Sequence, residues 1–437
     1  MLATIEPIPD ATDFSRLEEF FPRWREVPLY RDALAAADFS RLPLITKREI
    51  RQNFPQNFLR AGQNLDALLA EKSVELEHTS GTSDERTAVL FARGWWNAQE
   101  NRVLRLNRFI AAVLDEFPAA RRATIVPPIC NGVVCFSNYM AKAQRTLGNT
   151  LFVNQARIPF LLTETELVRM AGEVAEWSPQ FLDLDPVHGV WFALFCERRG
   201  IKFPSVKFIF YSYEFVSVVH RKIIARVFGV PVFNLYGSTE AGHLLIENER
   251  GEMRGCDENV FYEIINADKN GVGELVVTTL TNEIMPLLRY RTGDRVQRIG
   301  ENYLVHGRLR DALRRRDGKR VTTLEVDRCF EGVSGIAHYQ LRQAGSGEGQ
   351  MRLVGDEVTS RGTAGGERLL TSSPTGLDGG DCDLQFISDV VAIDAGDLNR
   401  LTARIGKLLG LENKIRAEVV EKLPPQPSGK FRLTYQA

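Results

Sequence analysis

The sequence lacks the features that mark several large classes of protein. Its six cysteines contain no Cys-x-x-Cys pair, which argues against a disulfide framework and against a structural zinc site. Its 55 basic and 56 acidic side chains leave a net charge of -1, so no basic field attracts nucleic acid. Apolar runs such as 190–196 are far too short to span a bilayer, and the first residues have no basic start and no apolar signal segment. These absences predict a cytoplasmic protein without a nucleic-acid or membrane partner.

The length and composition are those of a multi-domain globular protein. A chain of 437 residues is too long for one ordinary hydrophobic core, so two or three domains are expected. Hydrophobic residues make up 44% of the chain and charged residues 25%, which is typical of soluble proteins.

The middle of the chain alternates between strand-like and helix-like patterns. Helical patterns cover 161–177, 190–199 and 217–228, and the last two end at Gly200 and Gly229. Short apolar strands are predicted at 181–184, 206–210 and 232–233. This order predicts an α/β fold with a parallel sheet, whose ligands lie beyond the carboxyl ends of the strands. Residues 211–214 and 236–240 both stand at such ends.

The flanking regions have a different character. Thr46 and Glu49 form a capping-box pattern, and residues 97–117 predict one amphipathic helix. From 260 onward short strands dominate, which predicts a β-rich subdomain within a large domain at 1–310. A smaller α+β domain is predicted at 311–437, with most of 344–383 as a long surface loop because that segment is rich in Gly, Ser, Thr and Asp.

Four separated segments carry groups that suit one phosphate-handling site. Residues 78–83 (His-Thr-Ser-Gly-Thr-Ser) form a hydroxyl-rich glycine turn, and 234–240 (Asn-Leu-Tyr-Gly-Ser-Thr-Glu) end in a pair that can hold a phosphate and a divalent metal. Residues 290–294 (Tyr-Arg-Thr-Gly-Asp) supply an aspartate suited to a ribose, and 427–430 (Pro-Ser-Gly-Lys) place a lysine on a tail. Taken singly, each also fits an ordinary turn, a solvated carboxylate or a surface salt bridge. Their order and chemistry together favour ATP-dependent activation of a carboxylic acid.

These segments resemble the phenylacetate–CoA ligase-like branch of the adenylate-forming superfamily. The likeness covers nearly the whole chain and includes the Leu-Pro-x-x-Thr-Lys opening at 42–47, Gly307-Arg308 followed by Asp311, and Ser-Gly-Lys-Phe-Arg at 428–432. It implies a large N-terminal domain, a small mobile C-terminal domain and a site between them.

The resemblance implies a role for each residue around the phosphates. Thr239 is expected to bind the α-phosphate, Glu240 to hold Mg²⁺, and Lys430 to bridge the acid carboxylate and the phosphate. The β- and γ-phosphates are expected at the turn, which comprises Thr79, Ser80, Gly81, Thr82 and Ser83. The turn departs from the family pattern because it continues as Asp84-Glu85-Arg86-Thr87. Two carboxylates near a triphosphate oppose its binding unless they point away, and Arg86 is the nearby cation that could replace the usual lysine.

The resemblance also implies where the nucleoside and the acid bind. Asp294 and Arg308 are expected at the ribose, Tyr236 on the adenine, and Asp311 at the hinge between the domains. The remaining adenine and ribose candidates are Ser212, Tyr213, Glu214, Asn234 and Gly237. The acid pocket is assigned to Phe136, Tyr139, Tyr213 and Gly237, although Tyr213 fits the adenine face equally well.

The resulting expectation is an AMP-forming acid–thiol ligase that uses ATP, Mg²⁺ and an aromatic or small carboxylic acid. The acceptor is expected to be CoA. The basic run at 308–320 fits a dock for the 3′-phosphate of CoA or for an acidic carrier protein, and it also fits a solvated face beside the hinge. An acyl carrier protein or a nitrogen nucleophile is the alternative acceptor, and a non-catalytic nucleotide-binding relative is a further alternative. His78 and His243 flank the site, either as ligand contacts or as structural residues. The sequence is also compatible with a homodimer.

Overall fold

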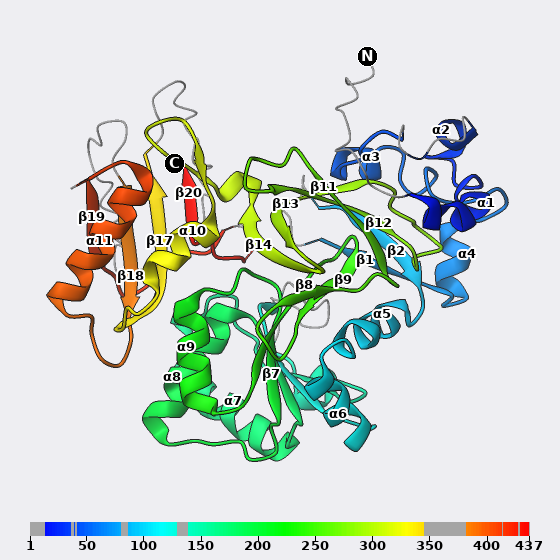
Figure 1. Cartoon of the computed structure of the whole chain (residues 1–437). Helices are drawn as coiled ribbons and strands as arrows, with labels where there is room; N and C mark the ends of the chain where they lie inside the picture. Colours follow the sequence, from blue (N-terminus) through cyan, green and yellow to red (C-terminus); the bar gives the residue numbers. More distant parts are fainter. Residues whose placement is uncertain are drawn as a thin grey trace, which may run out of the picture.

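A computed structural model describes residues 14–35, 39, 42–79, 86–128, 139–344, 382–412, 414–426 and 429–436. Its larger part is organised by a twelve-stranded sheet in the order β11-β12-β13-β14-β10-β9-β8-β7-β6-β3-β5-β4 (Figure 1). The α/β class predicted from the sequence is therefore confirmed.

The parallel half of this sheet contains β5, β3, β6, β7 and β8. Every residue of β6 and β7 is buried, as expected for strands covered on both faces. Helices α7, α8 and α9 pack on one face, and α5 and α6 pack on the other. The bounds are β3 (Arg122–Ile125), β4 (Thr146–Leu147), β5 (Thr150–Phe152), β6 (Phe181–Leu184), β7 (Phe208–Tyr211), β8 (Val232–Ser238), α5 (Trp95–Leu104), α6 (Arg108–Glu116), α7 (Glu164–Trp177), α8 (Pro186–Arg199) and α9 (Val218–Phe228), with short turns η4 (Lys142–Arg145) and η5 (Pro159–Leu161).

Local capping explains where these helices begin and end. Asp185 and Ser217 cap α8 and α9, and Gly200 and Gly229 end them with φ of 64° and 68°, where a side chain would be strained. The prediction of a single helix over 97–117 was wrong. The Asn107 side chain accepts a hydrogen bond from the amide of Ile110 and so starts α6 as a separate helix.

The antiparallel half of the sheet forms the predicted β-rich region. Strand β8 pairs parallel with β7 and antiparallel with β9, so the sheet changes direction at the strand that carries Tyr236. Thr46 and Glu49 form the predicted capping box of α3, and Ile45 bridges to Tyr290, which fixes α3 beside β13. The elements are η1 (Ser15–Phe20), α1 (Phe21–Trp24), α2 (Arg31–Ala35), α3 (Lys47–Arg51), α4 (Leu65–Ala70), β1 (Val74–His78), β2 (Ala88–Ala92), β9 (Gly242–Glu247), β10 (Met253–Gly255), β11 (Val260–Ile265), β12 (Val272–Thr279), β13 (Tyr290–Ile299) and β14 (Asn302–Arg308).

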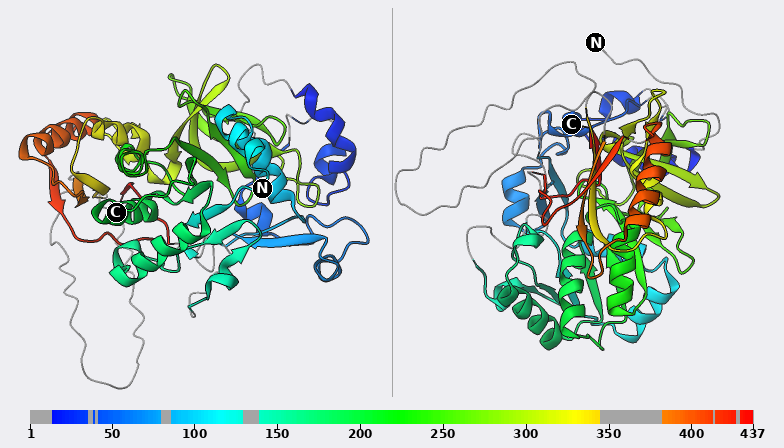
Figure 2. Two further views of the ribbon diagram at one scale, coloured as in Figure 1. Left: turned by 90° about the horizontal axis from the view of Figure 1, so that it is seen from below. Right: turned by 90° about the vertical axis from the view of Figure 1, so that its left-hand side faces the viewer.

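The C-terminal part of the chain builds its own four-stranded sheet, in the order β19-β18-β17-β20, around a separate core (Figure 2). Most of the predicted surface loop at 344–383 lies outside the described residues. In the described part of the chain, every helix is too short or too polar to cross a membrane. The elements are η6 (Leu309–Asp311), β15 (Leu313–Arg314), β16 (Arg320–Val321), α10 (Thr323–Asp327), η7 (Arg328–Phe330), β17 (Ile336–Gln343), β18 (Cys382–Ser388), α11 (Ala395–Leu409), β19 (Ile415–Val419) and β20 (Thr434–Gln436).

Candidate active site

The predicted ribose and adenine residues lie side by side on three strands. The Tyr236 hydroxyl on β8 donates a hydrogen bond to Asp294 Oδ2 on β13 at 2.7 Å. Arg308 stands opposite Asp294 on β14, with its Nε 3.8 Å from Asp294 Oδ1. Burial and the Asp294 carboxylate raise the pKa of Tyr236 well above its ordinary value, so the hydroxyl remains a donor.

Arg308 is the cation around which the predicted carboxylates gather. Burial opposes its charge, but Asp294, Asp311, Glu214 and Glu240 favour it, and the net effect raises the pKa of Arg308. These four carboxylates come from four different segments of the chain. The fold therefore brings the nucleoside, hinge and metal candidates into one electrostatic neighbourhood.

Glu240, the predicted metal ligand, is paired with a lysine that sequence reasoning did not assign to the site. The Glu240 side chain is almost fully buried, and its Oε1 lies 2.7 Å from Lys47 Nζ at the start of α3. Tyr290 also hydrogen-bonds to this carboxylate. Burial opposes ionisation of Glu240, but Lys47, a backbone hydrogen bond and Tyr290 together outweigh burial and lower the pKa of the carboxyl group. The only earlier signal for Lys47 was its place in the Leu-Pro-x-x-Thr-Lys segment.

The site around Glu240 fits a metal that is shared with a nucleotide. Magnesium in such sites takes one or two protein carboxylates and several phosphate or water oxygens. Glu240 supplies one carboxylate. Within the described residues, no group of three or more histidine, cysteine, aspartate or glutamate side chains is placed to hold a metal by itself.

Thr79 is hydrogen-bonded to Thr87 across the base of the predicted phosphate turn. Its amide donates to the Thr87 carbonyl, and its Oγ1 accepts from the Thr87 amide, each at 3.0 Å. Ser80, Gly81, Thr82 and Ser83 lie outside the described residues. His78 and Arg86, on either side of the turn, line an open cavity together with Arg51 of α3.

The tail that carries Lys430 docks onto the predicted adenine segment. Lys430 Nζ donates to the Tyr213 carbonyl at 3.0 Å, and the Phe431 amide donates to Glu214 Oε1 at 2.8 Å. Next along the chain, Arg432 Nε lies 3.1 Å from Asp311 Oδ1. Residues 430–432 of the tail thus contact both the predicted adenine segment and the predicted hinge aspartate.

Gly237 and Asn234 have structural explanations of their own. A Cβ atom on Gly237 would lie 2.3 Å from the Gly242 carbonyl oxygen, so the close approach of β8 and β9 requires glycine there. The backbone amide of Asn234 donates to Glu247 Oε2, a contact that does not depend on its side chain. Thr239 is half-buried between Ser238 and Glu240.

Ser212 belongs to a polar cluster with Asp183, Arg122, Glu100 and His243, which the sequence did not reveal. Its hydroxyl donates to Asp183 at 2.5 Å, and Arg122 is paired with both Asp183 and Glu100. Burial raises the pKa of Asp183 to about 6. His243 joins the other side of the cluster, with its Nε2 3.7 Å from Glu100 Oε1. The cluster lies under the segment that holds Tyr213.

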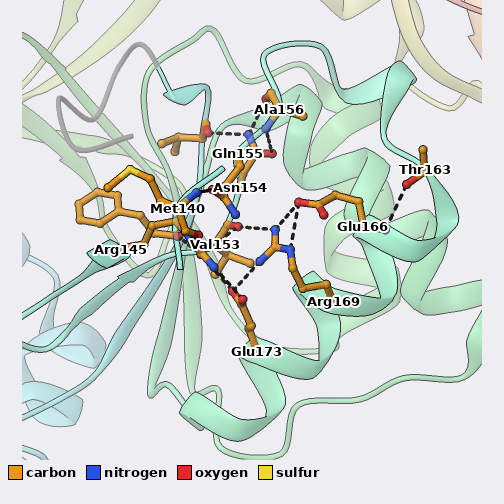
Figure 3. Close-up of polar contacts among 12 residues, drawn as sticks. Met140, Arg145, Val153, Asn154, Gln155, Ala156, Thr163, Glu166, Arg169 and Glu173 are labelled. Carbon is orange, nitrogen blue, oxygen red and sulfur yellow. Dashed lines mark hydrogen bonds and ion pairs between the residues drawn. The ribbon is translucent and has the colours of Figure 1, made fainter. Parts of the chain in front are cut away.

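The acid pocket predicted at Phe136, Tyr139, Tyr213 and Gly237 stays a prediction, because the structure describes only part of it. Tyr139 is 66% exposed, and its ring lies against Arg169 of α7. Figure 3 shows the ion-pair network beside it, in which Glu173 joins Arg169 to the buried Arg145. Phe136 lies outside the described residues.

The chain is similar to several known proteins. Phenylacetate-coenzyme A ligase of Pseudomonas putida is 26% identical over 296 residues, which cover 61% of each chain. Protein CapK of Staphylococcus aureus is 31% identical over 318 residues, covering 69% of this chain and 65% of CapK. A structure of 2-hydroxyisobutyryl-CoA ligase in the postadenylation state, in complex with R3-HIB-AMP, aligns with a TM-score of 0.67 at 14% identity and covers 97% of this chain and 88% of that protein.

In sequence the chain is similar to phenylacetate-coenzyme A ligases and to Protein CapK, and in fold it is similar to 2-hydroxyisobutyryl-CoA ligase. No family model matches it. The chain spans about three fifths of the length of the phenylacetate-coenzyme A ligases that it matches. The fold of 2-hydroxyisobutyryl-CoA ligase extends over nearly the whole chain. The relatives named phenylacetate-coenzyme A ligase confirm the resemblance found in the four segments.

Proposed function

We propose that this protein uses ATP to activate a carboxylic acid as an acyl-adenylate and then transfers the acyl group to the thiol of CoA. The observation that carries the proposal is the meeting of Asp294, held by Tyr236, and Glu240 around Arg308, with Lys430 and Arg308 both acting on Glu214. The activities named for its relatives are of the same type.

The proposed first step replaces a poor leaving group by a good one. A carboxylate oxygen of the acid attacks the α-phosphorus of ATP, the bond to the β-phosphate oxygen breaks, and pyrophosphate leaves. Negative charge is shared among the phosphate oxygens during this displacement, so the protein acts mainly by positioning and electrostatic stabilisation. In the second step the CoA sulfur attacks the acyl carbon and AMP leaves.

The positions of the side chains suggest how they divide this work. Asp294 accepts hydrogen bonds from the ribose hydroxyls, while Tyr236, held by Asp294, lies against the adenine. Lys430 moves a short distance from the Tyr213 carbonyl to the acid carboxylate and the α-phosphate, with Thr239 on the same phosphate. Glu240 would hold Mg²⁺, which would neutralise phosphate charge when bound. Lys47 is a second cation at the same carboxylate.

Acid-dependent exchange of labelled pyrophosphate into ATP tests the proposal. We expect exchange with Mg²⁺ and at least one acid from a panel of aryl and short-chain acids. Lys430→Ala should reduce it by at least about a hundredfold while ATP binding is retained, because the charge is removed only from the reacting centre. Lys422→Ala, which removes an exposed lysine from the same tail, is the matched control. No exchange with any acid, or full exchange in Lys430→Ala, would overturn the assignment.

The acceptor is proposed from an exposed basic hairpin next to the hinge. The β15–β16 hairpin carries Arg314, Arg315, Arg316, Lys319 and Arg320, all exposed, against the single acidic residue Asp317. Arginine groups of this kind bind phosphates, which CoA offers. The same charge would suit an acidic carrier protein, so AMP release should be compared with CoA and with an acyl carrier protein. Release that depends on the carrier alone would replace CoA as the acceptor.

A further inference from the structure

Three consecutive tail residues are each tied to a different group at the candidate site. Lys430 reaches the Tyr213 carbonyl, Phe431 reaches the Glu214 carboxyl group, and Arg432 reaches Asp311. Only the middle contact uses the main chain of the tail as donor. It therefore fixes the backbone between the two charged side chains, whatever their rotamers.

The segment that receives the tail has a strained backbone. Tyr213 has a φ of 77°, in the left-handed region that non-glycine residues rarely adopt. Such strain persists where surrounding contacts over-determine it, and it concentrates at functional sites. In this conformation the Tyr213 carbonyl accepts from Lys430 while the next residue, Glu214, accepts from Phe431.

The Glu214 carboxyl group lies among apolar rings and charges of both signs. The ring of Phe431, whose amide it binds, packs against Phe160 and His338 with centroids 5.5 Å away in both cases. Asp185 opposes a negative charge on Glu214, and Lys430 and Arg308 favour it. A hydrogen-bond acceptor at this position is needed because the buried Phe431 residue would otherwise hold an unpaired amide.

We propose that Glu214 is a positioning residue, whose carboxyl group holds the Phe431 amide and so places Lys430 before the substrates bind. The proposal rests on the proposed function of Lys430 in adenylation. A lysine on an unanchored tail would lose both backbone and side-chain freedom on reaching the substrate, and prior docking removes much of that cost. Glu214 thus acts on the tail, and a direct contact with adenine is not required for its effect.

The test compares Glu214→Ala, which removes the acceptor, with Glu214→Gln, which keeps an acceptor oxygen. Hydrogen exchange of the Phe431 amide reports docking without any catalysis. We expect exchange to be about tenfold faster in Glu214→Ala, the size of one lost hydrogen bond to a polar or charged group, and close to the parent rate in Glu214→Gln. Unchanged exchange of the α8 amides shows that the variant is folded. Glu418→Gln, which changes an exposed carboxylate on β19, is the control.

Kinetics then show whether docking serves the chemistry. At saturating acid, Glu214→Ala should lower the maximal rate of pyrophosphate exchange about tenfold with little change in the KM for ATP, and Glu214→Gln should restore it. Formation of thioester from supplied acyl-adenylate and CoA should not fall, because that step does not use Lys430 in its docked place.

The inference would be overturned if Glu214→Ala changed neither the hydrogen exchange of the Phe431 amide nor the rate of pyrophosphate exchange. A raised KM for ATP as the sole effect would also overturn it. Faster Phe431 exchange in a protein that adenylates no acid would support the docking role and refute only the proposed function.

Discussion

Glu240 and Glu214 are two site carboxylates within reach of a lysine, yet their surroundings shift their ionisation in opposite directions. At Glu240, Lys47 lies 2.7 Å away and lowers the pKa despite burial. At Glu214, burial and then Asp185 raise the pKa well above its ordinary value, and the opposing effects of Lys430 and Arg308 are smaller. Lys430 donates a hydrogen bond to the Tyr213 carbonyl.

The two lysines differ in how firmly the fold holds them: the charge of Lys47 is fixed, and that of Lys430 is movable. Lys47 stands at the start of a helix that is capped by Thr46 and tied to β13 through Ile45, so the charge facing Glu240 is held by the fold. Lys430 stands outside any helix or strand, on the tail that leads into β20, and its neighbours contact Glu214 and Asp311 through one hydrogen bond and one ion pair. The Glu240 side of the candidate site is therefore pre-organised, and we propose that the Lys430 side releases its charge to a substrate.

Removing the Glu240 charge should have the largest effect. Glu240→Gln keeps the size of the side chain but removes the negative charge proposed to hold Mg²⁺. We expect adenylation to fall by about 10²–10³, the range found when one preorganised electrostatic contact is lost. Pyrophosphate exchange over a range of Mg²⁺ concentrations measures it. Exchange with the parent's Mg²⁺ dependence would show that Glu240 is not the metal ligand.

Removing the partner of Glu240 should have a smaller effect, mainly on stability. Lys47→Met leaves a buried carboxylate without its cation, which in fully buried pairs costs about 3–5 kcal/mol. Because Lys47 is 45% exposed, solvent screens the pair, and we expect about 1–2 kcal/mol. Chemical denaturation measures the loss, with Lys422→Met as the control. A free energy of unfolding equal to that of the parent would contradict the view that Lys47 keeps Glu240 ionised.

Local features of the fold could be predicted from the sequence because their causes are local. The capping box at Thr46 and the glycine ends of α8 and α9 depend on residues a few positions apart. The helix predicted over 97–117 failed for the same reason, since apolar spacing continued past a local cap at Asn107.

The site was predictable only in part, because its contacts join distant segments. Family motifs indicated Tyr236, Asp294 and Lys430, and the structure brings all three to one neighbourhood. Nothing in the local pattern of Glu214 indicates an amide 217 residues further along the chain as its partner. Nor does the pattern around Lys47 indicate Glu240, because that pairing depends on how α3 docks against β13.

The smallest expected effect is the opposite pH dependence of stability in Glu214→Gln and Glu240→Gln. Glu214 has a folded pKa above its ordinary value of 4.5, so its stabilising contribution is complete below pH 4.5 and is lost as the pH rises through the folded pKa. Glutamine has no such loss, so Glu214→Gln should gain stability relative to the parent above pH 4.5. Glu240 has a lowered pKa, so its contribution is present above pH 4.5 and is lost as the pH falls through the folded pKa. The stability deficit of Glu240→Gln relative to the parent should therefore shrink in acid.

Unfolding temperatures measured between pH 4 and pH 8 test this contrast. Each variant should differ from the parent by about 1–3 °C, and the difference should change with pH in opposite directions for the two variants. Slopes of the same sign would mean that the two carboxylates share one environment, and the contrast between a fixed and a movable lysine would fail.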